Sequence, residues 1–324
     1  MNQEKIKELE QRIVRQYSNT TGVVVLKEGR LLYEKYFNGC TKESCVHIYS
    51  VTKSIVSALV GIALDKEYIE STGQRVLDFF PEYKVKRGEK TLQNITIRDM
   101  LTMTVPYKYH FFPPYINYFK SDDWVSFSLG QAGGRGKIGT FRYAPLIGPD
   151  ILSGILRKTV GKPMFDFAVE NLFLPLDIHV EDSLIFESKE EQMAFNRATD
   201  VSGWATDSVG NQAAGWGLTL TAMDMAKLGQ LYLDGGTWEG RQIISEKWVR
   251  ESTSRQSLWK QRNLPYGYLW WVHEDGFAAM GDGGNIIYVN KKEKLVISIA
   301  ALFVPKAGDR IELIQKYMEP IFVT

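Results

Sequence analysis

The chain has 324 residues and a net charge of +1, with 44% hydrophobic and 24% charged residues. This length can bury one large core or two interleaved ones, and the near-neutral charge excludes a strong attraction to nucleic acid. No apolar run reaches 18 residues, so we expect no membrane span. The charged N-terminal residues 1–5 lack the apolar core of a secretory signal, which favours a cytoplasmic protein over a secreted one with a removed leader.

The first part of the chain predicts a helix, a hairpin and a second, more apolar helix. Apolar residues recur at helical spacing over 3–17, and two strand-like runs, 21–27 and 30–37, are separated by a turn at Gly29. Apolar residues then fall at helical spacing over 51–63, immediately after Ser50. We therefore expect Ser50 in the first turn of a buried helix.

Ser50 and Lys53 form a Ser-x-x-Lys pair, in which residues three apart on a helix are neighbours. A serine hydroxyl is a weak nucleophile until a base takes its proton, and burial can keep a lysine partly neutral for that task. The alternative is an N-cap serine that opens a core helix. A second pair, Ser257 and Lys260, lies in a polar segment, and we interpret it as a surface coincidence.

The middle of the chain is mostly helical and loop-rich. Thr96 and Thr221 are candidate N-caps, and we expect helices over 95–103, 151–159, 164–171, 221–233 and 245–251. The aromatic segment 105–124 has no clear period, so it is either a functional loop or a cover over the core. Residues 133–139 contain Gly-x-Gly-x-x-Gly, but without a preceding strand and a following helix this motif does not predict a dinucleotide site.

The end of the chain has the period-two pattern of strands over 266–273, 277–280, 285–290 and 295–303, and a last helix over 309–318. One antiparallel sheet built from both chain ends is the economical topology. We therefore predict an α+β fold with helices from both termini flanking the sheet. Residues 1–70 and 260–324 would form the sheet subdomain, and residues 71–259 a mostly helical inserted subdomain of the same catalytic unit.

The histidines and cysteines predict no metal or redox site. The four histidines are scattered, and the spacing of Cys40 and Cys45 fits no zinc or redox motif. We expect a reduced cysteine pair and no metal ion or other cofactor.

Several segments together resemble the serine β-lactamase and penicillin-binding-protein superfamily. The helix that begins at Ser50 is similar to its nucleophile helix, and its framework segments resemble residues 79–83, 95–103, 215–221 and 266–271. The similarity is greatest to the class C-like branch, which also holds esterases, D-aminopeptidases and aminohexanoate-dimer hydrolases. The resemblance covers nearly the whole chain and implies a β-lactamase/transpeptidase-like fold.

The resemblance also implies catalytic roles. Ser50 would be the nucleophile, Lys53 its proton partner, and Tyr143 a second proton-transfer group, either as a phenolate or as a neutral shuttle. The family has Tyr-x-Asn or Tyr-x-Ser at the second motif, whereas this chain has Pro145 at the third position. Pro145 cannot offer a side-chain amide to the substrate. Without the resemblance, Tyr143 could equally be a tyrosine at the edge of the core.

The third motif of the family matches residues 281–285, where Asp282 stands in place of the usual lysine or histidine. An aspartate repels a substrate carboxylate and raises the pKa of a neighbouring phenol. The resemblance implies substrate contacts from Asp282, Gly283 and Gly284, and an oxyanion hole made by the backbone N–H groups of Ser50 and Asn285. On the residues alone, Asp282 could be an ordinary turn residue.

We therefore expect a serine hydrolase that acts on an ester or amide bond of a small molecule or short peptide-like substrate. Asp282 favours neutral or amine-bearing substrates, and three tyrosines of the aromatic segment could line the cleft: Tyr107, Tyr109 and Tyr115. One alternative is a β-lactamase or DD-peptidase in which Arg142 or Lys137 supplies the missing cation. A non-catalytic penicillin-binding-protein-like module that binds peptide or cell-wall fragments, and a structural partner-binding protein, are the others.

Overall fold

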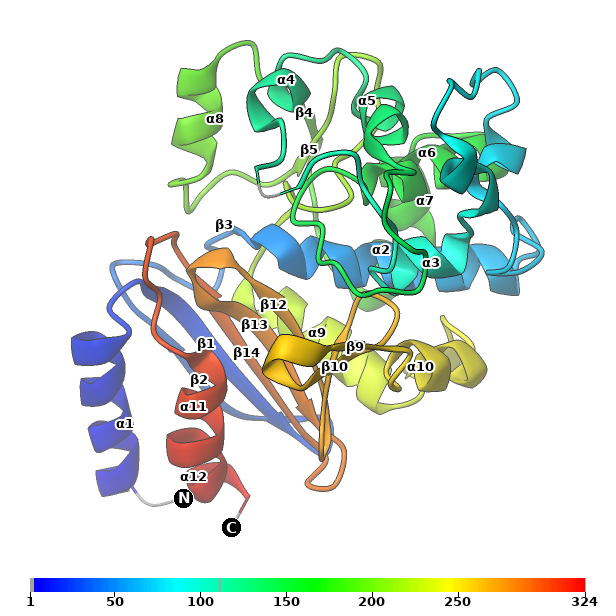
Figure 1. Ribbon diagram of the computed structural model, residues 1–324. Helices are drawn as coiled ribbons and strands as arrows, with labels where there is room; N and C mark the ends of the chain where they lie inside the picture. Colours follow the sequence, from blue (N-terminus) through cyan, green and yellow to red (C-terminus); the bar gives the residue numbers. More distant parts are fainter. Residues whose placement is uncertain (1–2, 111, 324) are drawn as a thin grey trace.

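The computed structural model describes residues 3–110 and 112–323, and one large antiparallel sheet organises them. Its strand order is β2-β1-β14-β13-β12-β11-β10-β9, so β1 and β14, from opposite ends of the chain, lie side by side (Figure 1). The strands are β1 (Thr20–Lys27), β2 (Arg30–Tyr36), β9 (Ser257–Trp259), β10 (Leu264–Tyr266), β11 (Trp271–His273), β12 (Gly276–Gly281), β13 (Asn285–Asn290) and β14 (Leu295–Ala301).

The central strands are buried on both faces because a helical layer covers each face. On β1, Val23 and Val25 pack with the terminal helices, α1 (Gln3–Gln16) and the run from α11 (Arg310–Glu312) to α12 (Glu319–Phe322). Val24 and Leu26 point to the opposite face, into the larger core that includes α9 (Ala222–Leu233). Alternation along the strand thus separates a terminal-helix layer from the layer that carries the rest of the chain.

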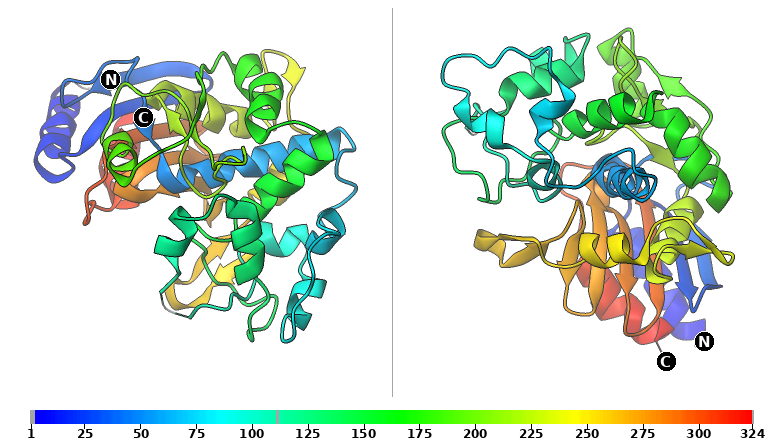
Figure 2. Two further views of the ribbon diagram at one scale, coloured as in Figure 1. Left: turned by 90° about the horizontal axis from the view of Figure 1, so that it is seen from above. Right: turned by 90° about the vertical axis from the view of Figure 1, so that its right-hand side faces the viewer.

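Most of the remaining helices form a second lobe above the sheet, with α2 (Thr52–Asp65) between the two parts, whereas α10 (Glu246–Ser252) lies beside α9 at the level of the sheet (Figures 1 and 2). Residues 52–63 of α2 are all buried, which explains its nearly continuous apolar sequence. The other helices are α3 (Ile97–Leu101), α4 (Tyr115–Phe119), α5 (Trp124–Gln131), α6 (Asp150–Val160), α7 (Met164–Ala168) and α8 (Lys189–Phe195).

In the described residues, three two-stranded pairs lie outside the large sheet: β3 (Val46–His47) with β6 (Thr219–Leu220), β4 (Ser183–Leu184) with β5 (Trp204–Ala205), and β7 (Thr237–Trp238) with β8 (Arg241–Gln242). The first of these pairs joins the chain just before Ser50 to the chain just before α9.

The predicted fold class is confirmed, since an antiparallel sheet from both chain ends carries terminal helices and a mostly helical insertion. The subdomain boundaries stay a prediction. Helix α9 lies within the predicted helical range 71–259, yet it packs against β1, β13 and β14 of the sheet.

Two predicted elements differ in detail. The strand expected over 266–273 is a hairpin of β10 and β11, with Leu269 at φ 62° in the turn and the Gly267 amide donating to the Trp270 carbonyl at 2.8 Å. The sequence run could not show this reversal, because residues 266–271 around the turn are all buried and do not alternate. The last helix continues beyond Met318 to Phe322, through a π-helical stretch at Leu313–Met318.

Candidate active site

Ser50 lies in a short 3-10 turn, Tyr49–Val51, immediately before α2 rather than inside it. Tyr49 has φ 50°, a left-handed conformation that is uncommon for a residue with a side chain and marks local strain. Its ring stacks on His47 with centroids 3.8 Å apart. The backbone before Ser50 is therefore held in one special conformation, as expected for a functional turn.

The end of β12 approaches this turn closely. A methyl group on Gly281 would lie 2.2 Å from the Ile48 carbonyl oxygen and 3.2 Å from the Ser50 amide nitrogen. Only glycine fits there, because a side chain would collide with the backbone that presents the serine. The third motif thus lies directly beside Ser50, although the two are separated by most of the chain.

Lys53 is buried one helical turn after Ser50, and its Nζ makes three hydrogen bonds. It lies 2.8 Å from Ser50 Oγ, and it donates to the Pro145 and Gly215 carbonyl oxygens at 2.7 Å each. A neutral amine has two N–H groups and one lone pair. With both N–H groups on the two carbonyls, the lone pair of neutral Lys53 faces the Ser50 hydroxyl.

Burial lowers the pKa of Lys53 to about 7, while the carboxylates of Asp282 and Asp150 oppose this lowering. At neutral pH a substantial fraction of Lys53 is therefore the free base. This is the condition under which a lysine can take a serine proton, and it needs no metal ion.

Tyr143 completes the group around Ser50. Its ring centroid is 5.2 Å from Lys53 Nζ and 5.5 Å from the ring of Trp271. Burial raises the pKa of Tyr143, a hydrogen bond with Ser50 lowers it, and Asp282 raises it. The net direction is upward, so Tyr143 is a neutral phenol at pH 7 and not a phenolate.

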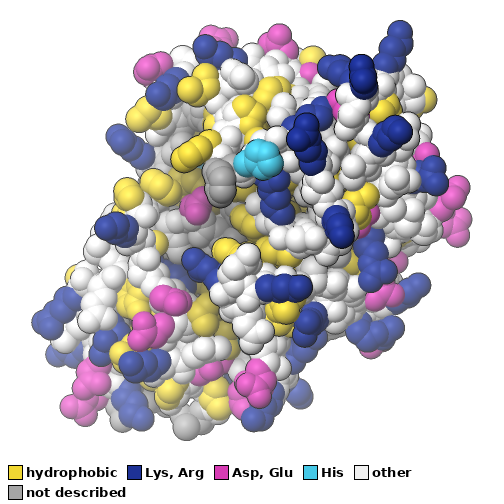
Figure 3. Space-filling view, in the orientation of Figure 1, with side chains coloured by type: hydrophobic (Ala, Val, Ile, Leu, Met, Phe, Trp, Pro, Cys, Tyr) yellow, Lys and Arg dark blue, Asp and Glu magenta, His cyan; other side chains and the backbone are white. Residues whose placement is uncertain are grey.

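Ser50 opens into a cavity of about 260 Å³ between the sheet and the helical lobe. Tyr115 from α4, Trp216 and the exposed Asp282 line it, together with His47, Tyr49, Phe119, Pro145, Leu146, Gln192 and Asn196. The hollow between the two lobes is visible in the space-filling view (Figure 3). Of the tyrosines expected in the cleft, Tyr115 lies in this cavity.

The structure places Tyr107 and Tyr109 elsewhere. Tyr107 is buried, and a methyl group on Gly148 would lie 2.1 Å from its Oη. The two rings stack with centroids 5.3 Å apart, and the Arg142 guanidinium lies over both. These aromatic residues therefore pack the loop and do not line the Ser50 cavity.

The glycines of the third motif also face away from the cavity. A methyl group on Gly283 would lie 2.7 Å from the Leu302 carbonyl oxygen, and one on Gly284 would lie 2.7 Å from Arg310 Nε. Both residues have positive φ, 76° and 89°, so they shape the turn after β12. Of the third-motif residues, Asp282 is the one whose side chain borders the Ser50 cavity.

Asn285 is buried at the start of β13 and pairs with Gly281 in the sheet. Its side chain donates to the Asp282 and Ala301 carbonyl oxygens at 2.9 Å each, and accepts from the Ala301 amide at 2.9 Å. The side chain therefore ties the turn to β14. The residue that follows Gly281, which lies against the backbone of Ser50, is Asp282.

Sequence reasoning missed the role of His47, which borders the same cavity. Its Nε2 accepts from the Gly217 amide at 2.8 Å, so Nδ1 carries the proton and donates to Asn196 Oδ1 at 2.9 Å. Burial lowers the pKa of His47 to about 3, which keeps the ring neutral. A single scattered histidine gave no signal, because its partners are far away in the sequence.

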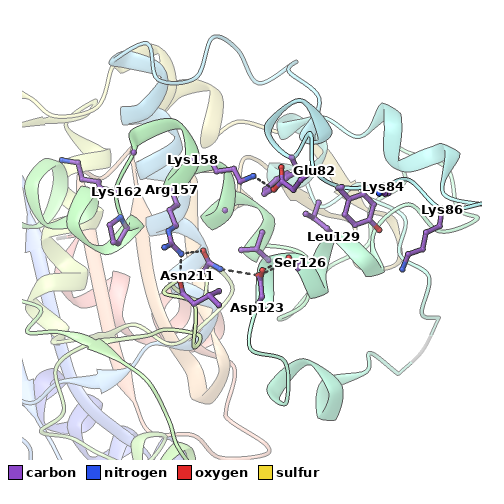
Figure 4. A pocket seen from close by; sticks show the side chains of 17 residues that line it. Glu82, Lys84, Lys86, Asp123, Ser126, Leu129, Arg157, Lys158, Lys162 and Asn211 are labelled. Carbon is purple, nitrogen blue, oxygen red and sulfur yellow. Dashed lines mark hydrogen bonds and ion pairs between the residues drawn. The ribbon is translucent and has the colours of Figure 1, made fainter.

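A larger cavity, of about 790 Å³, lies in the helical lobe away from Ser50 (Figure 4). Its polar groups largely pair with each other: Lys158 with Glu82, Arg157 with Asn211, and Ser126 with Asp123. Ser126 has no lysine or histidine base among these bonds. This cavity therefore offers no activated nucleophile.

Two further properties concern the described residues as a whole. No group of three or more histidine, cysteine, aspartate or glutamate residues in them is placed to hold a metal ion. None of the helices in ranges 3–110 and 112–323 is both long and apolar enough to cross a membrane.

An antiparallel sheet with a helical insertion, and a serine beside a buried lysine, are the arrangement that the sequence resemblance to β-lactamase-related serine hydrolases implies. The family model described as Beta-lactamase matches residues 7–316. The chain therefore belongs to the Beta-lactamase family, which confirms the resemblance found in the sequence.

A curated relative is the 6-aminohexanoate-dimer hydrolase of Paenarthrobacter ureafaciens, 24% identical over 260 residues. That match covers 76% of this chain and 59% of the relative, so the chain spans about three-fifths of its length. Among solved structures, a family VIII carboxylesterase has a TM-score of 0.72 at 15% identity, covering 97% of this chain and 96% of its own. The octameric penicillin-binding protein homologue from Pyrococcus abyssi has a TM-score of 0.70 at 18% identity, and the match covers 98% of this chain and 76% of that one.

Proposed function

We propose that the protein hydrolyses an ester or amide bond through an acyl-enzyme on Ser50. The observation that carries this proposal is the setting of Lys53, whose two carbonyl partners leave its lone pair facing Ser50 Oγ at 2.8 Å. Its lowered pKa, about 7, supports the same role. Pro145 thus contributes a backbone carbonyl where the family motif has a polar side chain.

In the first step, Lys53 Nζ takes the proton of Ser50 while Oγ forms a bond to the substrate carbonyl carbon. The neutral Tyr143 hydroxyl donates a proton to the leaving oxygen or nitrogen as the scissile bond breaks, and regains one from the Lys53 ammonium. Water then attacks the acyl-enzyme, with the same groups moving protons in the reverse sense, and Ser50 is released.

The tetrahedral intermediate needs two backbone donors for its oxyanion. The Ser50 amide is one. For the second donor, the Asn285 amide was expected, but the closeness of Gly281 to the Ser50 amide favours the N–H of Asp282, the next residue. We assign the hole to the Ser50 and Asp282 amides.

Asp282 also sets the charge preference of the site. Its exposed carboxylate borders the cavity and raises the pKa values of Lys53, Tyr143 and Tyr115. It repels a substrate carboxylate and attracts an ammonium group. The relative described as a 6-aminohexanoate-dimer hydrolase supports an amide bond as one target. A linear dimer of this amino acid carries a carboxylate as well as an amine, so the charge preference proposed here rests on Asp282 alone.

The test is hydrolysis of p-nitrophenyl acetate and butyrate by the wild type and by Ser50→Ala, with intact-mass analysis of the protein. We expect turnover and an acyl adduct in the wild type, and neither in Ser50→Ala. Absence of both in the wild type would favour the non-catalytic binding module instead.

The β-lactamase or DD-peptidase alternative needs a cation near Asp282. Arg142 cannot supply it, because its guanidinium donates to the Tyr107, Tyr109 and His110 carbonyl oxygens. Lys137 is exposed and does not border the Ser50 cavity. Slow or no hydrolysis of nitrocefin beside rapid ester hydrolysis is the expected result. Comparable rates would restore this alternative.

The charge preference has its own test. Asp282→Asn removes the carboxylate at nearly the same volume, and Asp275→Asn is a matched control in the β11–β12 turn. With p-nitroanilides of 6-aminohexanoic acid and of adipic acid monoamide, we expect Asp282→Asn to lower the preference for the amine by roughly three- to tenfold. An unchanged ratio would contradict the role of Asp282.

A cytoplasmic location, expected from the charged N-terminal residues, stays a prediction.

A further inference from the structure

A groove of about 680 Å³ runs between α4 and α8, next to the Ser50 cavity. Its floor and walls are mostly apolar: Ile116, Phe119, Ile185, Phe186, Met193 and Trp216. Hydrophobic side chains gather over this part of the upper lobe in the space-filling view, beside the hollow that separates the lobes (Figure 3).

The groove adjoins the Ser50 cavity, and the two together are called the channel below. Tyr115, Phe119, Gln192, Asn196 and Trp216 line both of them. A group attached to a carbonyl carbon at Ser50 can therefore pass along the Trp216 ring into the groove. Asn196 is fixed at this junction by its 2.9 Å hydrogen bond with His47, which keeps the passage in one shape.

The apolar side chains of the groove are unusually exposed. Ile116 is 73% exposed, Ile185 55% and Met193 45%. Together with Phe119, they make up four of the twelve large hydrophobic side chains that are exposed among the described residues. Exposed apolar area costs free energy of about 25 cal/mol per Å², so such a concentration in a concave site is typical of a surface that a ligand covers.

Different charged residues border the two ends of the channel. Asp282 lies at the Ser50 end, whereas Lys120, Glu187 and Lys189 border the groove. All four are exposed, so their charged groups can stay in water while the apolar side chains contact a ligand. A flexible hydrocarbon chain fits this lining better than a polar peptide.

We propose that the α4–α8 groove binds an aliphatic or aromatic chain of the substrate, carried by the carbonyl compound that acylates Ser50. This inference rests on the proposed function and deepens it. The substrate class is an ester or amide with an extended apolar arm, and Ile116, Ile185 and Met193 determine its selectivity for chain length.

The experiment compares ethyl octanoate, octyl acetate and ethyl acetate in a pH-stat assay. The groove variant combines Ile185→Glu with Met193→Glu. Both positions are exposed, so we expect the charged side chains to stay in water and the protein to fold. Leu174→Glu is the matched control, because Leu174 is 65% exposed and does not line the groove. The first two esters show whether the acyl or the alcohol side occupies the groove.

In the wild type and in Leu174→Glu, we expect kcat/KM for at least one octyl-bearing ester to exceed that for ethyl acetate. In the groove variant, that ester should lose at least about tenfold in kcat/KM, mostly through KM, while ethyl acetate changes less than about twofold. Equal losses for all three esters, or equal rates in the wild type, would overturn the proposal.

A binding measurement separates this inference from the proposed function. Ser50→Ala is titrated calorimetrically with N-octylacetamide, with and without the two groove substitutions. Binding that the groove substitutions abolish supports the groove even if no ester is hydrolysed. No binding, or a change of oligomeric state in the groove variant, would overturn the proposal that this groove binds the substrate chain.

Discussion

At the scale of the residue, Lys53 is the group whose ionisation controls the chemistry in the mechanism that we propose. Its reactive form is the neutral amine, and its pKa is lowered to about 7 by burial. We therefore expect kcat/KM for a neutral ester to rise with pH, with a midpoint near 7, and then to level off. The measurement is a pH profile between pH 5 and 9 with p-nitrophenyl acetate.

The Asp282 carboxylate raises the pKa of Lys53. Asp282→Asn should therefore move the midpoint of that profile to lower pH, whereas Asp275→Asn should leave it in place. A rate that is still rising steeply at pH 9 in the wild type would contradict a Lys53 base with a pKa lowered to about 7.

The same lowered pKa predicts how stability depends on pH. Between about pH 7 and pH 10.5, the folded protein keeps Lys53 neutral while the unfolded chain protonates it. The unfolded state binds more protons there, so this group makes stability rise with pH through that window. Relative to Lys53→Met, the unfolding free energy of the wild type should increase from pH 7 to pH 10 by on the order of 4 kcal/mol.

Urea unfolding of both proteins at the two pH values measures this difference. Because every other group is common to the two proteins, their titrations cancel in the comparison. A difference that stays constant with pH would show that the Lys53 amine is solvated and not buried in solution.

At the scale of the element, the turn between β12 and β13 holds the third motif against Ser50. The Asn285 side chain makes three hydrogen bonds of 2.9 Å, one to Asp282 within the turn and two to Ala301 of β14. Asn285→Ala should lower the unfolding free energy by about 2–4 kcal/mol, because it leaves buried backbone groups of Ala301 unpaired. It should also lower kcat, because the turn positions Asp282.

Asn290→Ala is the matched control, in the same strand and also buried. Its side chain donates to Glu319 Oε1 at 2.7 Å and accepts from the Glu293 amide at 3.0 Å, at the far end of β13. This variant should lose stability but keep kcat. If both variants lose the same activity, the turn has no special role. Thermal melts and ester hydrolysis supply the two readouts.

The elements also explain how much of the site could be predicted from the sequence. Ser50 and Lys53 lie one helical turn apart, so local spacing revealed the pair. Tyr143 and Asp282 meet them only through the fold, and they became visible through the family resemblance. Tyr107 resembles Tyr115 in local sequence, but it packs under Gly148. The choice between them depends on contacts that no local pattern encodes.

The fold was easier to predict than the site because its signals are repeated. The strands at both chain ends alternate or are apolar throughout, and the capping boxes at Thr96 and Thr221 are both present. The β10–β11 hairpin was missed, since its turn at Leu269 lacks the glycine or asparagine that usually marks a left-handed residue.

At the scale of the whole molecule, the sheet separates two hydrophobic cores, of which only one contains the helix that carries Lys53. Ile13 of α1 packs with the terminal-helix layer, and Ile55 of α2 packs in the core beneath Ser50 and Lys53. Each side chain is 1% exposed, so the two isoleucines are matched in type and burial. Substituting either by alanine should cost about 2–4 kcal/mol of unfolding free energy.

The two variants should differ in activity. The terminal-helix layer lies on the face of the sheet away from the cavity, so Ile13→Ala should keep kcat/KM within about twofold at temperatures well below unfolding. Ile55→Ala removes packing from the helix that carries Lys53, and a small displacement of a general base costs about tenfold or more in rate. Urea unfolding and p-nitrophenyl acetate hydrolysis at one temperature measure both effects. Equal losses of activity in the two variants would mean that the sheet transmits packing changes from one face to the other.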